Sequence, residues 1–168
     1  MSSTFTALRN RNYRLFAAGS LVSNVGTWMQ RVAQDWLVLE LTGSGRALGI
    51  TTGLQFLPMV LFSPMAGVIA DRYSKRRVIA ATQVVLGATA ALLGLLAVTG
   101  WVATWQVYVI AFVFGIGAAF DTPARQAFVN EMVPREQLAN AVGLNSASFN
   151  LARMVGPALA GGLIAALG

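Results

Sequence analysis

The residue types in this sequence limit the chemistry that it can support. Its 168 residues include no cysteine and no histidine, and six acidic residues stand against 12 lysines and arginines. Thiol catalysis, disulfides, structural zinc sites and triads that need an imidazole are therefore excluded. We expect no catalytic residue, no metal site and no cofactor. What needs an explanation is a small number of charged and amide side chains within long apolar stretches.

Polar side chains recur at helical spacing in two of these stretches. Near the N-terminus the set is Ser20, Asn24, Thr27, Arg31 and Asp35. Near the C-terminus the set is Ser146, Asn150 and Arg153. Steps of three or four residues place each set on one face of a helix.

An intramembrane charge costs about 2.5–3.5 kcal/mol on insertion scales, so its presence calls for a reason. We expect a substrate or proton cavity lined by Asn24, Arg31, Asp35, Asn150 and Arg153. In this interpretation Asp35 accepts a proton or a cation, and Arg153 binds an anionic group or faces a protonatable carboxylate. The alternatives are structural: an ion pair between Arg31 and Asp35, and an ion pair or a carbonyl contact for Arg153.

The stretches that position these side chains are long enough to cross a membrane. Charged residues make up 11% of the chain and the mean hydropathy is +0.64, whereas soluble domains carry roughly 25% charge. A membrane span needs about 20 apolar residues. Five stretches are near or above that length: 15–39, 47–70, 78–99, 103–120 and 138–167. We predict an all-α polytopic membrane protein, with polar breaks at 42–46, 71–77, 100–101 and 121–137 and with residues 1–14 as a tail.

The basic residues are distributed unevenly among the predicted loops. Nine of the 12 lie on one side: Arg9, Arg11, Arg14, Arg72, Lys75, Arg76, Arg77, Arg125 and Arg135. The positive-inside rule places this side, and with it the N-terminus, in the cytoplasm. Trp28, Trp36, Trp101 and Trp105 fall toward the opposite side, as interfacial aromatic residues do. The pI of about 11.1 therefore reflects topology, and we expect contact with the lipid bilayer and none with nucleic acid.

The segment between the second and third stretches has the most specific pattern. Gly67 is followed after three residues by Asp71 and Arg72, and then by a basic cluster. This pattern resembles the signature of the major facilitator superfamily between its second and third helices, with Ser74 where the family most often has glycine. The resemblance implies a conformational latch formed by Gly67, Asp71, Arg72, Lys75 and Arg76. The alternative is an ordinary positive-inside hairpin.

Two further segments add to the resemblance. The fifth stretch is similar to the fifth-helix pattern of exporters in this superfamily, which implies a gating helix with Gly143, Gly156, Pro157 and Gly161. Plain helix packing is the alternative. The break at 121–137 resembles the branch that contains enterobactin and macrolide exporters. We expect Asp121 to join the latch by pairing with Arg72 or Arg76, or else to pair locally with Arg125 in a solvated loop.

The resemblance covers nearly the whole chain but only the first five of about twelve helices. It implies the fold of the major facilitator superfamily, with residues 15–168 as an incomplete N-terminal bundle that needs a C-terminal bundle for transport. The implied function is a proton-coupled exporter (an antiporter) of small molecules of the drug, macrolide or siderophore class, working by alternating access. The implied place is the cell membrane, crossed several times. The alternative is a truncated, non-transporting membrane fragment or an assembly partner; an enzyme is not expected.

Overall fold

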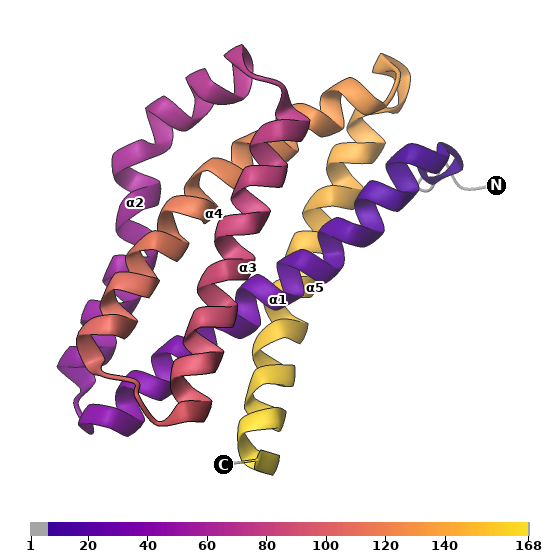
Figure 1. The fold of residues 1–168 in the computed structure, drawn as a ribbon. Coiled ribbons are helices and arrows are strands. Elements are labelled where there is room, and N and C mark those ends of the chain that lie inside the picture. The colour runs from indigo at the N-terminus through magenta and orange to yellow at the C-terminus, as the bar shows by residue number, and fades with distance from the viewer. Residues whose placement is uncertain (1–6, 168) are drawn as a thin grey trace. The chain divides into compact units, whose positions relative to one another are not determined.

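The computed structural model describes residues 7–167 as long α-helices joined by short connections (Figure 1). The helices are α1 (Arg11–Thr42), α2 (Gly45–Arg72), α3 (Lys75–Thr99), α4 (Thr104–Met132) and α5 (Leu138–Leu167). A 3₁₀ turn, η2 (Arg135–Gln137), leads directly into α5. There is no strand within residues 7–167, so the prediction of an all-α protein is confirmed.

Four segments are long and apolar enough to cross a membrane. They are α2, α3, α4 and Arg135–Ala166, which contains most of α5. The helix α1, with 32 residues, is not among these candidates, because the stripe that includes Arg31 and Asp35 makes it more polar. At 1.5 Å per residue α1 is about 48 Å long, which exceeds the hydrocarbon core of about 30 Å. Its crossing of the membrane stays a prediction based on length.

The connections before α2 and after α3 explain why the helices end there. Gly43 has a φ of 60° and Gly100 a φ of 71°, values at which a residue with a Cβ is strained. The Ser44 hydroxyl accepts a hydrogen bond from the Ala47 amide and so caps α2. The N–H of Gly100 donates to Ala97 and Leu96 at the end of α3. The helices are interrupted at 43–44, 73–74 and 100–103, so the breaks predicted at 42–46, 71–77 and 100–101 are confirmed in position but not in their bounds.

The predicted break at 121–137 is wrong over most of its length, because α4 continues to Met132. Its 29 residues make a helix of about 44 Å. The helix is therefore longer than the hydrocarbon core, which is about 30 Å thick. Pro123 lies within the helix. The hydroxyl of Thr122, the residue before it, donates to the Ala118 carbonyl at 3.1 Å. At the other end of the chain, α1 begins at Arg11, inside the predicted tail, and residues 1–6 of that tail lie outside the described part.

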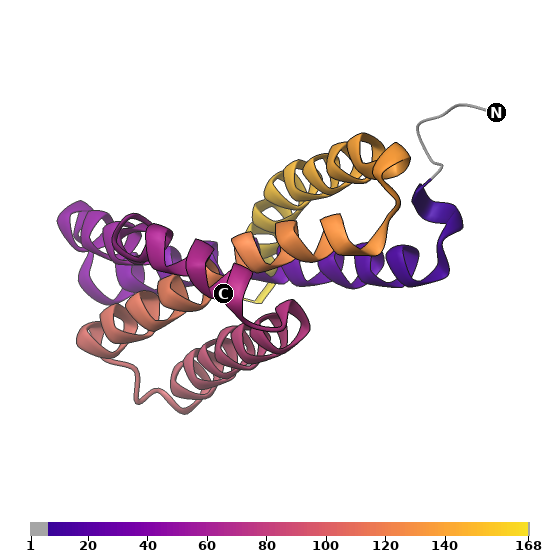
Figure 2. The same ribbon diagram turned by 90° about the horizontal axis from the view of Figure 1, so that it is seen from above.

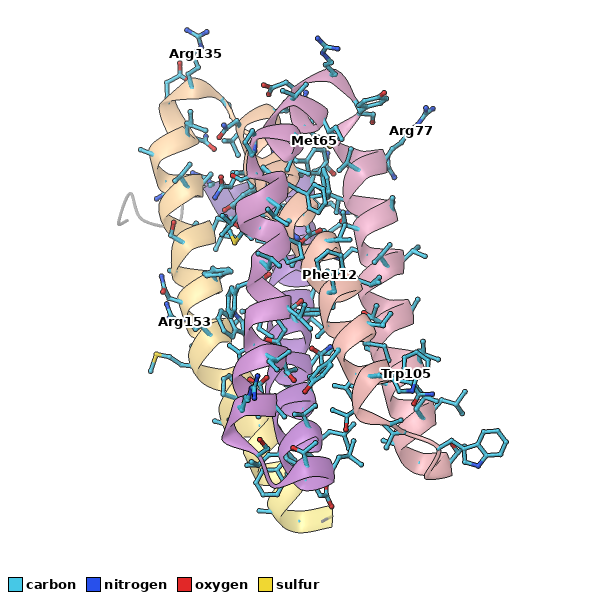
Figure 3. The ribbon with its side chains drawn as sticks, turned by 90° about the vertical axis from the view of Figure 1, so that its left-hand side faces the viewer. Met65, Arg77, Trp105, Phe112, Arg135 and Arg153 are labelled. Carbon is cyan, nitrogen blue, oxygen red and sulfur yellow. The ribbon has the colours of Figure 1, made fainter. Side chains whose placement is uncertain are left out.

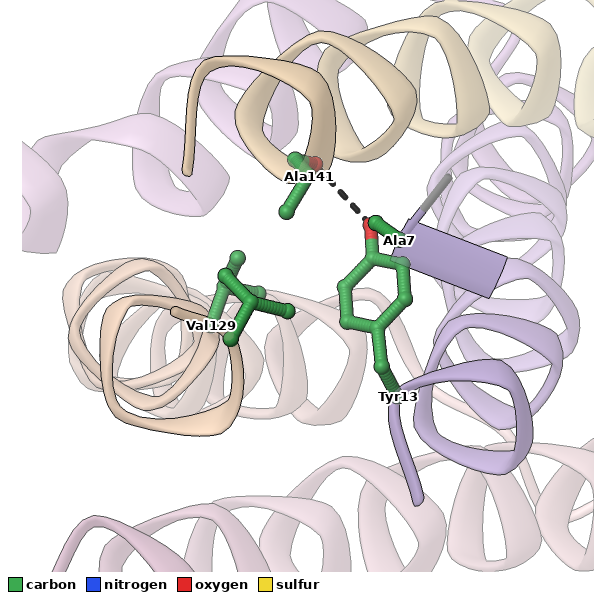
Figure 4. Close-up of a cluster of buried hydrophobic side chains, with 5 residues drawn as sticks. Ala7, Tyr13, Val129 and Ala141 are labelled. Atoms are coloured by element: carbon green, nitrogen blue, oxygen red, sulfur yellow. Dashed lines mark hydrogen bonds between the residues drawn. The ribbon is translucent and has the colours of Figure 1, made fainter. Parts of the chain in front are cut away.

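The described part of the chain divides into two compact units. The first comprises residues 7–30 and 126–167. Its core contains Ala7, Tyr13, Val129, Val133 and Ala141. The Tyr13 hydroxyl donates to the Ala141 carbonyl at 2.9 Å, which joins the start of α1 to the start of α5 (Figure 4).

The second unit comprises Arg31–Arg125. Its core cluster contains Val38, Ala47, Leu93, Val107 and Ile110. Here α4 lies between α2 and α3, as Figure 2 shows from above. A Cβ placed on Gly115 of α4 would come within 2.6 Å of the Gln55 carbonyl oxygen of α2, and one on Gly117 within 3.2 Å of the Leu86 side chain of α3. These two glycines let α4 pack closely against both neighbours.

Candidate functional site

A polar cluster joins α1 to α2 in the second unit. The Gln55 amide nitrogen donates to the Gln34 side-chain oxygen at 3.0 Å and to Asp35 Oδ1 at 3.1 Å. The Thr52 hydroxyl is 3.3 Å from the same Asp35 oxygen and 3.1 Å from the Leu48 carbonyl oxygen, so these two acceptors share its one proton. Gln34 and Gln55 are fully buried, with 0% and 1% of their surface exposed. The carboxylate of Asp35 therefore contacts two neutral polar groups of the neighbouring helix, and the Gln55 amide is the nearer donor.

Helical spacing brings these side chains together. Gln34 and Asp35 lie one turn after Arg31 on α1, whereas Thr52 and Gln55 are three residues apart on α2 and so share a face. Within the described residues, Gln34 Nε2 and Gln55 Oε1 are buried atoms without a hydrogen-bond partner. A buried amide with an unpaired donor or acceptor atom can form a hydrogen bond with a ligand or a water molecule.

Arg31, which was predicted for the cavity, contacts aromatic rings in this unit. Its guanidinium carbon lies 4.3 Å from the ring centre of Phe56 on α2 and 5.1 Å from that of Phe114 on α4. Contacts of this kind stabilise a cation by about 0.5–2 kcal/mol. Arg31 and Asp35 thus lie one turn apart on α1, and both contact side chains of α2.

A second polar cluster holds α3 to α4. Arg125 Nε donates to Asp121 Oδ2 at 2.5 Å, one helical turn apart on α4. From α3, the Thr82 hydroxyl and the Gln83 amide donate to Asp121 Oδ1 at 2.7 and 3.0 Å. Asp121 and Arg125 are each 7% exposed. Asp121 therefore pairs with Arg125, which was the predicted alternative to pairing with Arg72 or Arg76. The pair is buried within a helix and does not lie in a solvated loop. Its part in a latch stays a prediction.

The other predicted latch residues lie around the connection from α2 to α3. Gly67, Asp71 and Arg72 are in the last turns of α2, and Lys75 and Arg76 begin α3. Asp71, Arg72 and Arg76 are exposed. A Cβ on Gly67 would meet no atom within 4 Å. In the described residues this glycine thus makes no close helix contact.

Arg153 lies on an exposed face of α5 in the first unit (Figure 3). Ser146 and Asn150 share that exposed face, as their spacing predicted. The Asn150 amide donates to the Ser146 carbonyl at 2.9 Å. The Arg153 guanidinium lies 5.7 Å from the ring centre of Trp28 on α1, and Trp28 packs edge to face with Phe149 at 6.1 Å. Asn24 is partly buried on α1.

The predicted gating helix approaches α1 closely at one glycine. A Cβ on Gly156 would lie 2.6 Å from Trp28 Cβ and 2.9 Å from the Val25 carbonyl oxygen. Pro157 follows within α5. At Gly143 and Gly161 a Cβ would meet no atom within 4 Å. Close packing therefore explains Gly156, and it does not explain the other two glycines within the described residues.

Sequence reasoning missed three residues of the first cluster: Gln34, Thr52 and Gln55. These side chains carry no charge, so the high cost of a charge in an apolar stretch does not draw attention to them. None of the three belongs to a motif described above. A usable signal was present in Gln55, an amide in the middle of the apolar stretch 47–70. A buried amide in a membrane span needs a hydrogen-bonding partner on another helix.

Comparison with known proteins gives one consistent picture. The profile of the transmembrane secretion effector family matches residues 2–168. Macrolide efflux protein A of Streptococcus pyogenes is 31% identical over 85% of this chain. The staphyloferrin A transporter of Staphylococcus aureus is 31% identical over 90% of the chain, and the multidrug efflux pump Tap of Mycolicibacterium fortuitum is 33% identical over 92%. No solved structure matches the chain.

The chain spans only about a third of the length of these relatives. It covers 35% of the macrolide efflux protein and 38% of each of the other two. All three are named as transporters or efflux proteins and none as an enzyme.

Proposed function

We propose that this chain, which belongs to the transmembrane secretion effector family of the major facilitator superfamily, forms the N-terminal part of an exporter of small molecules. Its relatives are named for the efflux of macrolides and of several drugs and for the transport of a siderophore. The proposed substrates are of these classes, and transport would also need the C-terminal bundle. The N-terminus would lie in the cytoplasm of a cell-membrane protein, as the basic residues indicate.

The coupling ion in this proposal is the proton, and its acceptor is Asp35. The observation that supports this role is the contact of one Asp35 carboxylate oxygen on α1 with the Gln55 amide and the Thr52 hydroxyl on α2. An ionised carboxylate only accepts hydrogen bonds, whereas a protonated one also donates. Protonation would therefore change the contact between the two helices and remove an intramembrane charge at the same time. Such a change can bias an alternating-access equilibrium.

The other predicted residues have supporting roles in this scheme. The cavity would include Asn24, Arg31, Asn150 and Arg153. The latch would consist of Gly67, Asp71, Arg72, Lys75, Arg76 and Asp121. The gating helix would use Gly143, Gly156, Pro157 and Gly161. The close approach of α5 to α1 at Gly156 supports the last assignment, because a small shift there alters the packing of both helices.

Efflux assays in inverted membrane vesicles test this proposal. The vesicles would contain the product of the complete reading frame, and a panel of macrolides, amphipathic dyes and siderophores would be offered with and without a proton gradient. Asp35→Asn should abolish gradient-driven transport, because the amide cannot bind and release a proton at this position. Glu40→Gln, which removes an exposed acid further along α1, is the matched control and should retain transport.

Three outcomes separate the parts of the proposal. Gradient-driven transport by Asp35→Asn at the wild-type rate would refute Asp35 as the proton acceptor and leave the exporter function standing. Transport by Arg153→Ala at the wild-type rate would give Arg153 a structural role. If the correctly inserted protein moves none of the panel under any gradient, the alternative of a non-transporting membrane component is favoured.

A further inference from the structure

A groove runs along the second unit between α2 and α3, with α4 as its third side. Its volume is about 520 Å³. Most of its lining is apolar: Ile69, Val78, Ala81, Val85, Ile116 and Phe120. The polar lining residues Tyr73, Ser74 and Arg77 all come from the connection between α2 and α3 and the first turn of α3. Thr82 also lines the groove, but its hydroxyl hydrogen bond goes to Asp121. The groove is thus apolar along its length and polar at one end.

The length of the groove corresponds to one leaflet of a bilayer. On α3 the lining residues run from Ser74 to Val85, which is about 16 Å at 1.5 Å per residue. Half of the hydrocarbon core of a bilayer is about 15 Å thick. Ala81, midway along the groove, is exposed, so the groove is open to its surroundings there. An open apolar groove of this length fits the acyl chain of one lipid.

The polar end of the groove carries a concentration of positive charge. The segment 71–77 holds Arg72, Lys75, Arg76 and Arg77 but only one acid, Asp71. Arg77 lines the groove and is exposed, and Figure 3 shows it pointing away from the helices. Within residues 7–167 its guanidinium makes no hydrogen bond or ion pair. A phosphate group is the kind of partner that such a guanidinium binds best.

The start of α3 adds a second attraction for an anion at the same end. Ser74 stands at the N-cap of this 25-residue helix, and its side chain makes no capping hydrogen bond. The first N–H groups of a helix have no partners within the helix, and together with the helix dipole they favour a negative charge.

We propose that this groove binds an anionic phospholipid of the cytoplasmic leaflet. The acyl chain would lie against α2, α3 and α4, and the phosphate would lie beside Arg77 and the start of α3. Charge complementarity selects an anionic over a zwitterionic headgroup, since a basic residue in contact with an anionic headgroup contributes about 1 kcal/mol. The positive-inside rule assigns the segment 71–77, and so this lipid, to the cytoplasmic leaflet. The proposal goes beyond the transport function and does not depend on the role of Asp35.

Native mass spectrometry can test the binding directly. The product of the complete reading frame would be reconstituted in nanodiscs of equal parts phosphatidylglycerol and phosphatidylethanolamine, released, and examined for retained lipid. Arg77→Ala removes the charge at the groove, and Arg76→Ala removes a neighbouring exposed charge that does not line it. Ala81→Phe fills the groove, and Ala80→Phe places the same ring on an exposed neighbour outside the lining.

The wild type should retain one phosphatidylglycerol in preference to phosphatidylethanolamine. Arg77→Ala should weaken that retention about five-fold, which corresponds to about 1 kcal/mol, and Arg76→Ala should weaken it much less. Ala81→Phe should abolish retention, whereas Ala80→Phe should keep it. Equal retention of the two lipids, equal effects of the two arginine variants, or wild-type retention by Ala81→Phe would each overturn the proposal.

A competition experiment needs only the wild-type protein, so it stays informative if a variant fails to fold. Soluble glycerophosphoglycerol, which has the headgroup without acyl chains, would be added to the lipid-loaded protein. It should displace the lipid far less effectively than phosphatidylglycerol does, because it cannot fill the apolar part of the groove. Equal displacement by the headgroup alone would show that the groove takes no acyl chain.

Discussion

Replacing Asp121 should destabilise the protein more than replacing any exposed acid. Both oxygens of its buried carboxylate accept hydrogen bonds, one from Arg125 and the other from Thr82 and Gln83. Asp121→Asn leaves the guanidinium of Arg125 buried without its carboxylate, and breaking a buried pair in this way costs about 3–5 kcal/mol. Thr82→Val removes one hydrogen bond to a charged group and should cost about 1.5–3 kcal/mol.

The assay is the free energy of unfolding in mixed detergent micelles, measured by titration with a denaturing detergent and followed by circular dichroism. Asp71→Asn is the matched control, since Asp71 is an exposed acid at the end of α2, and a surface change of this kind stays within about 0.5 kcal/mol. The double variant Asp121→Asn, Arg125→Gln should lose less than the sum of the two single losses, because the residues are coupled. An Asp121→Asn variant as stable as Asp71→Asn would refute the reasoning.

Two further predictions concern the first unit. Gly156→Ala should destabilise it by about 1–3 kcal/mol through overpacking, because the new methyl group would lie 2.6 Å from Trp28 Cβ. Gly161→Ala, the control, should be neutral. Thermal unfolding of the two variants measures the difference, and equal midpoints would contradict the close contact. Tyr13→Phe should cost about 0.5–1.5 kcal/mol through loss of the hydrogen bond to the Ala141 carbonyl, and hydrogen exchange at the start of α5 should rise with it. Unchanged exchange there would show that this bond does not anchor α5 to α1.

Much of the helical organisation could be predicted because membrane spans leave a strong signal in sequence. The stretches at 47–70 and 78–99 contain no charged residue, and they correspond to α2 and α3 with boundaries that differ by at most three residues. The end of α4 could not be placed in the same way. Polar residues from Asp121 onward indicate where the hydrocarbon ends, but an amphipathic helix can continue past that point when its polar side chains find partners.

The candidate site was predictable only in its charged members. Arg31 and Asp35 attract notice because charge in an apolar stretch is costly, whereas Gln55 becomes conspicuous only when its partners on α1 are known. The glycine pattern of α5 has a similar limit. Which of Gly143, Gly156 and Gly161 touches another helix depends on where α5 crosses α1, and the crossing point is a property of the packed structure. The structure places it at Gly156.

The pairing of Asp121 with Arg125 has a consequence for how the protein enters the membrane. Because the two residues are one turn apart on the same helix, the Asp121 carboxylate leaves the translocon together with its own counterion, Arg125. The bonds from Thr82 and Gln83 need α3 beside α4, so they form only at assembly. Biogenesis can thus separate into an insertion step that α4 completes by itself and a docking step that α3 then locks.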